Sequence, residues 1–529
     1  PILVSVKLEE NSCFYVPVSE IADCPDRQDG KKKVTKIVYD WLSKVTGRIL
    51  AWGMLTGVRP TKLAMQKLEA GMSRKEVCTF LEQEYGVSHQ KAELGIAIAE
   101  REKELLGRLD YEQGFSLYVG IPFCPSICSY CSFSSSPLAE WKDRVDDYLK
   151  ALCQEIRALG ERAEERKLNT IYIGGGTPTT LEAEQLFELL DTIQKSFSFE
   201  YLQEFTIEAG RPDSITREKL EVMRRFPVTR ISVNPQTMQQ KTLDLVGRKH
   251  TVQDVKDIFH AARELGFDNI NMDLIAGLPG ETAEDMRDTL CQIEELSPDS
   301  LTVHALAIKR AAKFGQEQRK IDLHSEIEQM VEESARAAER MGLVPYYLYR
   351  QKNIAGNFEN VGYAKVDKAG IYNILIMEEK QTILAAGAGA STKIVLPEKI
   401  RLANGADKGL TLPDMVRKYK EDLVGEANYA RFGNKFPLLI KFIDAKLDLS
   451  IQVHPGDELA KKRHNSFGKN EMWYVIAADQ GAKLISGFAE QITPKEYKER
   501  VYNGTFADVL QTCAIKPGDV FYVPAGRVH

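Results

Sequence analysis

The chain has 529 residues, 43% of them hydrophobic, and a formal net charge of −6, so its length predicts several domains rather than a single core. The basic run at 31–33 is interpreted as a solvated face rather than a nucleic-acid-binding surface, and no apolar run approaches the ~18 residues of a membrane span. Nine cysteines without a signal peptide argue against a disulfide framework and favour the reducing cytoplasm.

The first 112 residues are predicted to form a short β segment followed by a helical cap. Apolar side chains recur with helical spacing at 33–44, 60–69, 74–84 and 90–106. No chemistry can be assigned to this region from its sequence. Because strand-like runs lie directly at both ends of the chain, we expect the natural protein to extend beyond them.

From residue 116 onward, short β-rich runs alternate with amphipathic helices. The expected strands are 116–121, 170–173, 204–208, 229–233, 269–275 and 300–304, and the expected helices are 138–165, 181–196, 214–225, 238–246, 251–265 and 281–295. Six β-then-α units predict a parallel sheet with right-handed crossovers, and they fit a partial barrel better than a closed eightfold one. Chemistry in such folds lies at the carboxyl ends of the strands.

The residues that carry candidate chemistry fall at those strand ends. In chain order they are Cys124, Cys128 and Cys131, then Gly174, Gly175, Gly176 and Thr177, then Glu208, Gln236 and Asp273. The triple glycine would let the backbone approach a ligand closely, although a tight βα turn alone would also use glycine.

Three cysteines within eight residues could hold one metal centre. A structural zinc ion needs four ligands, usually Cys or His, and no histidine lies between His89 and His250. Thiolates also hold cubane iron–sulfur clusters, in which three cysteines would leave one iron open to another ligand. A zinc knuckle completed by a distant ligand and three unrelated core thiols remain as alternatives.

The pattern beyond residue 305 continues with a helix at 323–341 and strand-like runs at 345–350, 371–377 and 381–386. After about residue 400 it changes, because a helix at 412–421 leads into dense β runs of a sandwich or barrel type. The predicted domains are 1–112, 113–304, 305–400 and 401–529.

The motifs resemble those of the radical S-adenosylmethionine (SAM) superfamily and, more narrowly, of the oxygen-independent coproporphyrinogen III oxidase family. The resemblance covers essentially residues 1–398. It rests on Tyr118-x-x-Ile-Pro-Phe-Cys with the cysteine spacing, Gly-Gly-Gly-Thr-Pro at 174–178, Arg-Ile-Ser-Val-Asn-Pro-Gln at 230–236, Gly-Arg-x-His at 247–250, Asp-Leu-Ile-Ala-Gly-Leu-Pro-Gly-Glu-Thr at 273–282, Tyr-Leu-Tyr-Arg-Gln at 347–351 and Gly-Asn-Phe-Glu-Asn-Val-Gly-Tyr at 356–363.

This resemblance implies a [4Fe–4S] cluster on the three cysteines, with SAM chelating the fourth iron through its amino and carboxylate groups. The residues that it implies for SAM are Gly174, Gly175, Gly176 and Thr177 beside the methionine moiety, Glu208 beside the ammonium or sulfonium, Arg248 at the carboxylate, and Gln236 and Asp273 at the ribose hydroxyls. Tyr118 is the catalytic candidate. The implied reaction is one-electron reduction of the cluster, cleavage of SAM to a 5′-deoxyadenosyl radical, and hydrogen abstraction from the substrate.

The function implied by the resemblance is oxidative decarboxylation of the tetrapyrrole coproporphyrinogen III to protoporphyrinogen IX in haem biosynthesis, with an electron donor such as flavodoxin or ferredoxin. Gly120 and Phe133 depart from the best-known oxidases, which carry histidine and cysteine at these positions. Branches without that cysteine include haem-transferring proteins. The long helical N-terminal region and Cys-Ser-Tyr-Cys-Ser-Phe at 128–133 look most like the coproporphyrinogen dehydrogenase branch, and a haem-binding carrier is the alternative.

The last segment carries a separate set of candidate metal ligands. Gln452 and His454 share one strand face because side chains alternate with period two, Glu471 opens a further strand, and His529 follows the last one. These four side chains suit Zn²⁺ with room for a labile ligand. Polar residues on the wet face of a sheet would show the same spacing.

This segment resembles type I mannose-6-phosphate isomerase, a cupin, over about 403–529. The matching runs are 436–446, 450–455, 464–474 and 518–529, and Lys469 is a catalytic candidate that would contact a hexose phosphate. Because the family's opening strands and downstream half-barrel are missing, we expect a truncated zinc cupin whose metal ligands could be present without isomerase activity. The expected fold class is α/β, with a partial (β/α)6 radical SAM barrel, a helical N-terminal region and a C-terminal all-β partial cupin.

Overall fold

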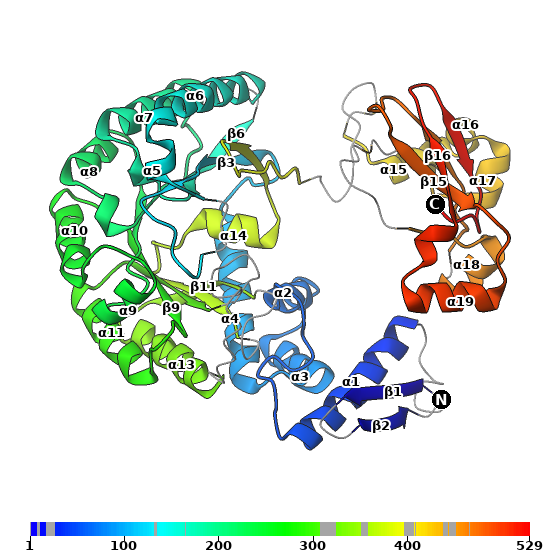
Figure 1. Cartoon of the computed structure of the whole chain (residues 1–529), viewed down its shortest axis with the longest axis horizontal. Coiled ribbons are helices and arrows are strands. Elements are labelled where there is room, and N and C mark those ends of the chain that lie inside the picture. Colours follow the sequence, from blue (N-terminus) through cyan, green and yellow to red (C-terminus); the bar gives the residue numbers. More distant parts are fainter. Residues whose placement is uncertain are drawn as a thin grey trace. The chain divides into compact units, whose positions relative to one another are not determined.

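The computed structural model describes residues 2–7, 11–16, 27–131, 135–163, 166–306, 324–350, 358–395, 407, 409–436, 438, 443, 451–464 and 466–529. These residues form two compact units. One contains residues 42–414, and the other combines residues 1–41 with residues 415–529. Figure 1 shows the elements of both units, coloured along the chain.

A nine-stranded sheet lies at the centre of the described part of the unit of residues 42–414. Six parallel neighbours follow one another in chain order, namely β3 (Gly114–Ile121), β6 (Lys167–Gly175), β7 (Glu204–Gly210), β8 (Arg230–Val233), β9 (Ile270–Ala276) and β10 (Ser300–Ala305). At one edge, β13 (Thr382–Ala386) adds in parallel to β3. At the other, β12 (Asn360–Ala364) and β11 (Val344–Tyr349) add antiparallel beyond β10. The sheet is open at β11 and β13, and its six successive units confirm the expected partial barrel.

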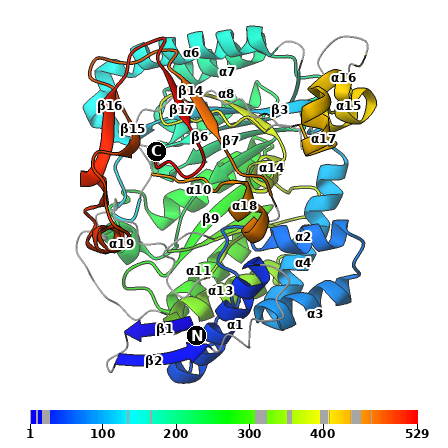
Figure 2. The same cartoon turned by 90° about the vertical axis from the view of Figure 1, so that its right-hand side faces the viewer.

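Helices connect the parallel strands and form an arc outside the curved sheet (Figure 1). They are α6 (Val145–Arg162), α7 (Ala183–Ser196), α8 (Arg217–Arg224), α10 (Val252–Glu264), α11 (Ala283–Leu296) and α13 (His324–Arg340). Thr251 and Thr282 start α10 and α11 through capping boxes, which satisfy amide groups that the first helical turn leaves free. The views in Figures 1 and 2 both show α6 and α7 side by side. None of the helices in the described ranges is long and apolar enough to cross a bilayer.

Shorter elements lie in the loops between the strands and helices of this unit. They are β4 (Phe123–Cys124), β5 (Ser136–Pro137), α5 (Leu138–Trp141), η2 (Lys142–Arg144), η3 (Pro178–Thr180), η4 (Pro212–Ser214) and α9 (Gln240–Leu245). Several of these loops carry the candidate site residues, as expected for chemistry at the carboxyl ends of parallel strands.

The two faces of the sheet differ in character because side chains alternate along each strand. Leu117, Val119 and Ile121 of β3 are fully buried with Ile171 and Ile173 of β6, and all five belong to the main hydrophobic core with the surrounding helices. The residues between them point to the opposite, inner face of the sheet. The sequence pattern therefore places polar side chains on the concave side of the arc.

The N-terminal helices pack into the same core as the sheet. They are α2 (Thr61–Glu69), α3 (Arg74–Tyr85) and α4 (His89–Gly107). Trp52 is 1% exposed and donates from Nε1 to Oε2 of Glu359 at 2.7 Å, which ties this region to the segment before β12. Ahead of these helices lie the hairpin of β1 (Ile2–Lys7) with β2 (Asn11–Val16) and the helix α1 (Arg27–Thr46).

The sequence-based expectation of a strand at 371–377 is wrong. This segment forms the helix α14 (Ile371–Glu378), with Tyr372, Ile374, Leu375 and Glu378 buried. A short apolar run does not distinguish a buried strand from a buried helix by periodicity alone. The helix lies on the inner face of the sheet, since the ring of Tyr372 stacks on that of Tyr172 at 4.6 Å.

The C-terminal segment contains two antiparallel strand pairs within its described residues. They are β14 (Glu471–Tyr474) with β17 (Val520–Val523), and β15 (Lys483–Phe488) with β16 (Leu510–Ala514). The accompanying helices are α15 (Leu412–Tyr419), α16 (Glu421–Val424), α17 (Glu426–Phe432), α18 (Asp457–His464), α19 (Pro494–Asn503) and η6 (Phe506–Val509). Most of the expected run at 436–446 lies outside the described residues.

Candidate cofactor and metal sites

The loop that carries Cys124, Cys128 and Cys131 is held by the loop that follows α9. Ser126 donates from Oγ to the carbonyl of Gly247 at 3.0 Å, and the amide of Ser129 donates to the carbonyl of Val246 at 3.1 Å. Cys128 is buried, whereas the other two cysteines are partly exposed. The loop therefore has a defined conformation that offers two partly exposed thiols and one buried thiol.

Two arginines bring positive charge to the buried thiol. Nη1 of Arg211 lies 3.8 Å from Sγ of Cys128, and Nη1 of Arg248 lies 3.9 Å from the same sulfur. Asp213 fixes Arg211 by accepting from Nε at 2.9 Å and from Nη2 at 2.7 Å. Burial opposes ionisation of Asp213, but the hydrogen bonds and charge of Arg211 hold its pKa below the usual value. These cations would stabilise negative charge on a cluster and its thiolates.

The three thiols of the loop favour a cluster over a single zinc ion. Cys124, Cys128 and Cys131 supply three thiols, whereas a structural zinc ion needs four ligands. A cubane cluster instead takes each thiolate on a different iron. The residues present therefore fit a [4Fe–4S] cluster better than a zinc knuckle.

The glycine turn at 174–176 packs against the strand end that leads into Cys124. The amide of Thr177 donates to the carbonyl of Phe123 at 2.7 Å, and a Cβ on Gly176 would lie 2.5 Å from that oxygen. Thr177 also places its Oγ1 3.5 Å from the sulfur of Cys124. Glycine is thus required at 176 by close backbone packing. The turn would serve a ligand by allowing close approach rather than through the Thr177 amide.

A row of partly exposed side chains, which we call the inner row, lines the face of the sheet away from the arc of helices. Its members come from β3, β6, β7, β9, β10 and β11 and are Tyr118, Tyr172, Glu208, Asp273, His304 and Tyr349. On β3, β7, β9 and β10 the inner-row residue is partly exposed while the rest of its strand is buried. The inner row is therefore the part of these four strands that a ligand could reach.

Members of the inner row contact one another along the sheet. The rings of Tyr118 and Tyr172 stack at 6.1 Å, and the hydroxyl of Tyr172 donates to Oε2 of Glu208 at 3.2 Å. The hydroxyl of Tyr349 lies 3.2 Å from Nδ1 of His304. A Cβ on Gly174 would lie 2.7 Å from Oε2 of Glu208, so the glycine turn contacts this row as well as the cysteine loop.

The charges on the inner row suit a cationic ligand. Burial, and then the charge of Asp273, raise the pKa of Glu208 to about 7, while the hydrogen bond from Tyr172 and the charge of Arg230 offset this only in part. Burial, followed by the charge of Glu208, also raises the pKa of Tyr118 and Tyr172, so both hydroxyls stay protonated at neutral pH. A cation placed beside the two carboxylates would relieve their repulsion, which agrees with the ammonium or sulfonium that the sequence analysis assigned to Glu208.

Buried polar atoms at the carboxyl end of β8 are left without partners. These atoms are Oε1 of Gln236, Oδ1 of Asn234 and Nε of Arg248, none of which has a hydrogen bond within the described residues. Gln236 also has a positive φ of 69°, and its amide donates to the carbonyl of Asp273 at 2.9 Å. Because unpaired buried polar atoms are costly, their grouping fits a polar ligand such as SAM at this edge.

The structure brings the sequence-predicted residues of this region together at one end of the sheet, but several neighbours were not foreseen. The missed residues are Arg211, Tyr172, His304 and Tyr372. Tyr172 could have been found, because it lies two residues before the first glycine of the turn and so shares its face. Arg211 shows no local signal, because its role depends on a contact with a loop 83 residues earlier in the chain.

Gly120, one of the two positions that differ from the best-known oxidases, lies within the described residues. A Cβ on Gly120 would lie 3.1 Å from the carbonyl of Ala388, and the carbonyl of Gly120 accepts from the hydroxyl of Tyr148 at 2.6 Å. A histidine there would have to displace the segment after β13. Phe133, the second departure, lies outside the described residues.

Three of the four candidate zinc ligands in the C-terminal segment converge. The donor atoms of His454, Glu471 and His529 lie within 4.8 Å of one another. Nε2 of His454 is 3.4 Å from Oε1 of Glu471, and Nε2 of His529 is 3.5 Å from Oε2. Nδ1 of His529 lies 3.0 Å from the carbonyl of Arg527, a pairing that leaves Nε2 to face the carboxylate.

Lys469 and Gln452 join this group in different ways. Nζ of Lys469 lies 3.1 Å from Nε2 of His454 and forms an ion pair with Glu471. The ammonium therefore contacts two of the candidate ligands at the place where a metal cation would bind. Burial, followed by the charge of Lys469, lowers the pKa of His454 and favours its neutral, ligating form. Gln452 exchanges two backbone hydrogen bonds with His529, at 2.7 and 3.0 Å, beside an isolated antiparallel bridge between Val453 and Val528, and so lies next to it. The donor set fits Zn²⁺.

Comparison with known proteins agrees with this division of the chain. Residues 118–292 match the radical SAM superfamily, and residues 399–478 match the catalytic domain of type I phosphomannose isomerase. The chain is 41% identical over 396 residues to the oxygen-independent coproporphyrinogen-III oxidase-like protein HemZ of Bacillus subtilis, which covers 73% of this chain and 78% of that protein. It is 38% identical over 210 residues to the haem chaperone HemW of the same organism, covering 40% of this chain and 55% of that one.

Among solved structures, the chain is similar to the coproporphyrinogen III oxidase HemN of Escherichia coli, with 23% identity and a TM-score of 0.45, over 61% of this chain and 77% of that one. The similarity to HemZ is high in identity and covers most of both proteins. The chain therefore belongs to the radical SAM superfamily and, within it, to the family of oxygen-independent coproporphyrinogen-III oxidase-like proteins.

Proposed function

We propose that the chain is a radical SAM enzyme that converts coproporphyrinogen III to protoporphyrinogen IX by oxidative decarboxylation. The observation that carries this proposal is that the glycine turn at 174–176 contacts both the cysteine loop and the inner row. A cluster on the cysteines would then lie next to aromatic and polar side chains that can hold a large organic substrate. The oxidase-like relative, which matches the chain over 396 residues, supports the same reaction.

Different residues would hold the two proposed cofactors. Cys124, Cys128 and Cys131 would hold the cluster, and Glu208 with the unpaired atoms near Gln236 would hold SAM. Together the cluster and SAM would supply one-electron chemistry that removes a hydrogen atom from the substrate. An electron donor such as flavodoxin or ferredoxin and a cytoplasmic location are part of the proposal.

The conversion of propionate to vinyl groups requires few catalytic side chains from the protein. Each reacting propionate loses one hydrogen atom from the carbon next to the ring, then one further electron to a one-electron acceptor, and becomes a vinyl group as its carboxylate leaves as carbon dioxide. No protein side chain must carry a proton in this conversion. The tasks left to the chain are to orient the tetrapyrrole, to exclude water, and to hold the charges of cluster and SAM. The protonated hydroxyls of Tyr118 and Tyr172 could orient the substrate as hydrogen-bond donors.

The cysteine assignment can be tested by reconstitution without oxygen. We expect about four irons per chain, and we expect alanine at any of the three cysteines to abolish both cluster assembly and SAM cleavage. Cys153→Ala is the matched control, because Cys153 is buried in α6 away from the loop. Normal iron binding by the loop variants, or tightly bound zinc with no iron uptake, would exclude this assignment.

A haem-binding carrier is the second candidate function, and His304 is the feature that favours it. A histidine can bind haem iron as an axial ligand. Burial lowers the pKa of His304, which keeps the imidazole neutral, and it lies on the inner row beside Tyr349. A relative named as a haem chaperone is 38% identical to the chain over 210 residues. Tight haem binding that is lost in His304→Ala, without turnover of coproporphyrinogen, would establish the carrier.

For the C-terminal segment we propose a zinc site on Gln452, His454, Glu471 and His529, with Lys469 contacting a hexose phosphate. The convergence of three ligands supports the metal, and the match to the phosphomannose isomerase catalytic domain supports the substrate class. The test is the conversion of mannose 6-phosphate to fructose 6-phosphate with added zinc. Activity that is lost in Glu471→Gln would establish the isomerase. Zinc binding without turnover would instead establish a metal-binding module.

A further inference from the structure

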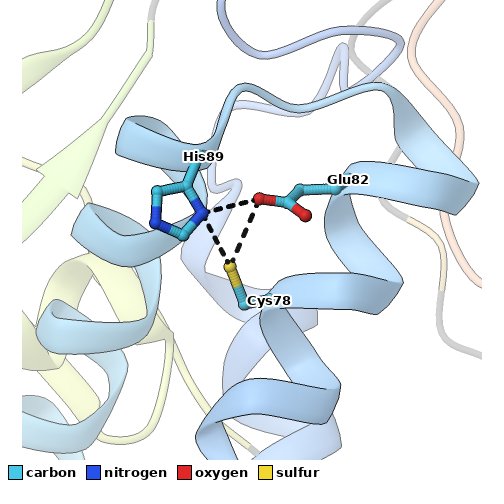
Figure 3. A group of neighbouring side chains, drawn as sticks. All are labelled: Cys78, Glu82 and His89. Carbon is cyan, nitrogen blue, oxygen red and sulfur yellow. Dashed lines mark hydrogen bonds and ion pairs between the residues drawn. The ribbon is translucent and has the colours of Figure 1, made fainter.

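A second group of metal-ligating side chains lies in the N-terminal helices, far along the chain from either site. Cys78 and Glu82 are four residues apart on α3, and His89 is the first residue of α4. Figure 3 shows the three side chains pointing toward one another from the two helices. Sγ of Cys78 is 3.6 Å from Oε1 of Glu82 and 3.6 Å from Nδ1 of His89, and Nδ1 of His89 is 2.7 Å from Oε1 of Glu82.

The triangle of donor atoms has nearly the size that tetrahedral zinc requires. With Zn–S near 2.3 Å and Zn–N and Zn–O near 2.1 Å, a sulfur donor of a tetrahedral site lies about 3.6 Å from a nitrogen or oxygen donor. A nitrogen donor lies about 3.4 Å from an oxygen donor. Both separations from Cys78 already have this value. The pair of His89 and Glu82 is shorter because it is hydrogen bonded, and it would open by about 0.7 Å when a metal replaces the shared proton.

The helix ends that present these ligands are well defined. A capping box of Ser73 with Glu76 starts α3, and Gly86 ends it in the left-handed conformation. Ser88 caps α4 by accepting from the amide of Lys91, directly before His89. Only three residues separate the two helices, so the short turn fixes the position of the α4 donor relative to the two donors of α3. A metal could bind with little change in the backbone.

The exposure of the three side chains leaves the outer side of the group facing solvent. Cys78 is 5% exposed, whereas the side chains of Glu82 and His89 are 36% and 76% exposed. The sulfur thus lies at the inner end of the group, and the two other donors face outward. Three protein ligands with one solvent-facing position are typical of zinc sites that keep a water or bind a further ligand.

We infer that Cys78, Glu82 and His89 form a zinc site with a water molecule as fourth ligand, which links α3 to the start of α4. The three ligand types suit Zn²⁺ better than Mg²⁺ or Ca²⁺, which prefer oxygen alone. The site is independent of the function proposed above. Its zinc would hold the turn between the helices and leave one position open toward solvent.

The test uses the full chain with its cluster reconstituted and with His454→Ala and Glu471→Gln in place, so that the C-terminal group no longer contributes. The probe is Zn²⁺ alone. We expect one zinc per chain, and we expect X-ray absorption at the zinc edge, which does not detect iron, to show one sulfur at about 2.3 Å with nitrogen and oxygen ligands. Cys78→Ser should remove the sulfur signal, and His89→Ala should weaken zinc binding at least about tenfold.

Two control variants keep the test decisive. Cys153→Ser changes a buried cysteine and His260→Ala an exposed histidine outside the group, and both should bind zinc as the parent does. If Cys78→Ser fails to fold, His89→Ala decides the question, because its side chain is mostly exposed. Zinc without a sulfur ligand, or binding unchanged by His89→Ala, would show that the group is only a surface ion pair beside a core thiol.

Discussion

Arg211 and Asp213 form a two-bond ion pair whose guanidinium also reaches the cysteine loop. The side chain of Arg211 is 5% exposed and that of Asp213 is 18% exposed. The remaining nitrogen, Nη1, donates to the carbonyl of Ser126 at 2.9 Å and lies 3.8 Å from the sulfur of Cys128. One arginine therefore connects the carboxyl end of β7 to the residues proposed to bind iron.

Replacement of Arg211 by methionine should damage both folding and cluster retention. The change leaves the carboxylate of Asp213 without its partner, which costs on the order of 3 kcal/mol for a buried pair and somewhat less here because Asp213 keeps some exposure. It also frees the loop at Ser126. Denaturant unfolding and iron content after reconstitution measure the two effects. Arg217→Met, at an exposed ion pair, is the control and should change neither. Full iron retention by Arg211→Met would contradict the proposed role.

Glu208→Gln should change the pH dependence of stability. The pKa of Glu208 rises from 4.5 to about 7 on folding, through burial and then the charge of Asp273, so the folded state holds this proton more tightly than the unfolded chain. The resulting penalty is absent below about pH 4.5, grows as the pH rises to 7, and reaches up to about 3 kcal/mol above that. Glutamine avoids the penalty.

Urea unfolding of both proteins at pH 5 and pH 8 tests this. The variant should be the more stable protein at pH 8, and its advantage should shrink toward pH 5. SAM should lose affinity in the variant, because the carboxylate that would face its positive charge is gone. A stability difference that is the same at both pH values would refute the shifted ionisation of Glu208.

Gly176→Ala should disrupt the site through backbone packing alone. The added Cβ would lie 2.5 Å from the carbonyl of Phe123, which precedes the first cysteine. Overpacking of this kind costs about 1–3 kcal/mol and would move the strand end that carries Cys124. Gly107→Ala, where nothing lies within 4 Å at the end of α4, is the matched control and should be neutral or slightly stabilising. Circular dichroism melting and the affinity for SAM compare the two variants, and equal behaviour would contradict the prediction.

Lys469→Met should strengthen zinc binding in the C-terminal segment. The ammonium of Lys469 contacts His454 and forms an ion pair with Glu471, so it competes with a cation for the same two ligands. Its removal ends both the competition and the charge repulsion, whereas Glu471→Gln should weaken zinc binding. Competition with a coloured chelator measures both affinities. Weaker binding in Lys469→Met would mean that the lysine supports the metal rather than competing with it.

Much of the barrel could be predicted from the sequence, because its signals are local. Six β/α units appear as alternating apolar patterns, and each of the six parallel strands agrees with its expected range to within a few residues. The strand expected at 371–377 is wrong, because an apolar run of that length fits a buried helix as well as a strand. The structure has the helix α14 there, and the stacking of Tyr372 on Tyr172 places it on the inner face of the sheet.

The candidate sites were predictable where residue types and spacing carry the signal. Such local signals are the cysteine spacing, the glycine run and the candidate ligands His454, Glu471 and His529. Arg211, His304 and Tyr372 depend on strand register and on contacts between distant segments, which sequence periodicity does not fix. The group of Cys78, Glu82 and His89 could be predicted only in part. A cysteine and a glutamate four residues apart share a helix face, but the turn that brings the histidine to them is not evident from the sequence.

The central proposal is that the chain is an enzyme acting on a tetrapyrrole, and product analysis without oxygen tests it most directly. The reconstituted protein is incubated with SAM, a strong reductant and coproporphyrinogen III, and both protoporphyrinogen IX and 5′-deoxyadenosine are quantified. We predict that both accumulate in proportion and that neither forms in Cys124→Ala, Cys128→Ala or Cys131→Ala. Haem bound tightly while coproporphyrinogen III remains unchanged would contradict the account and establish a carrier.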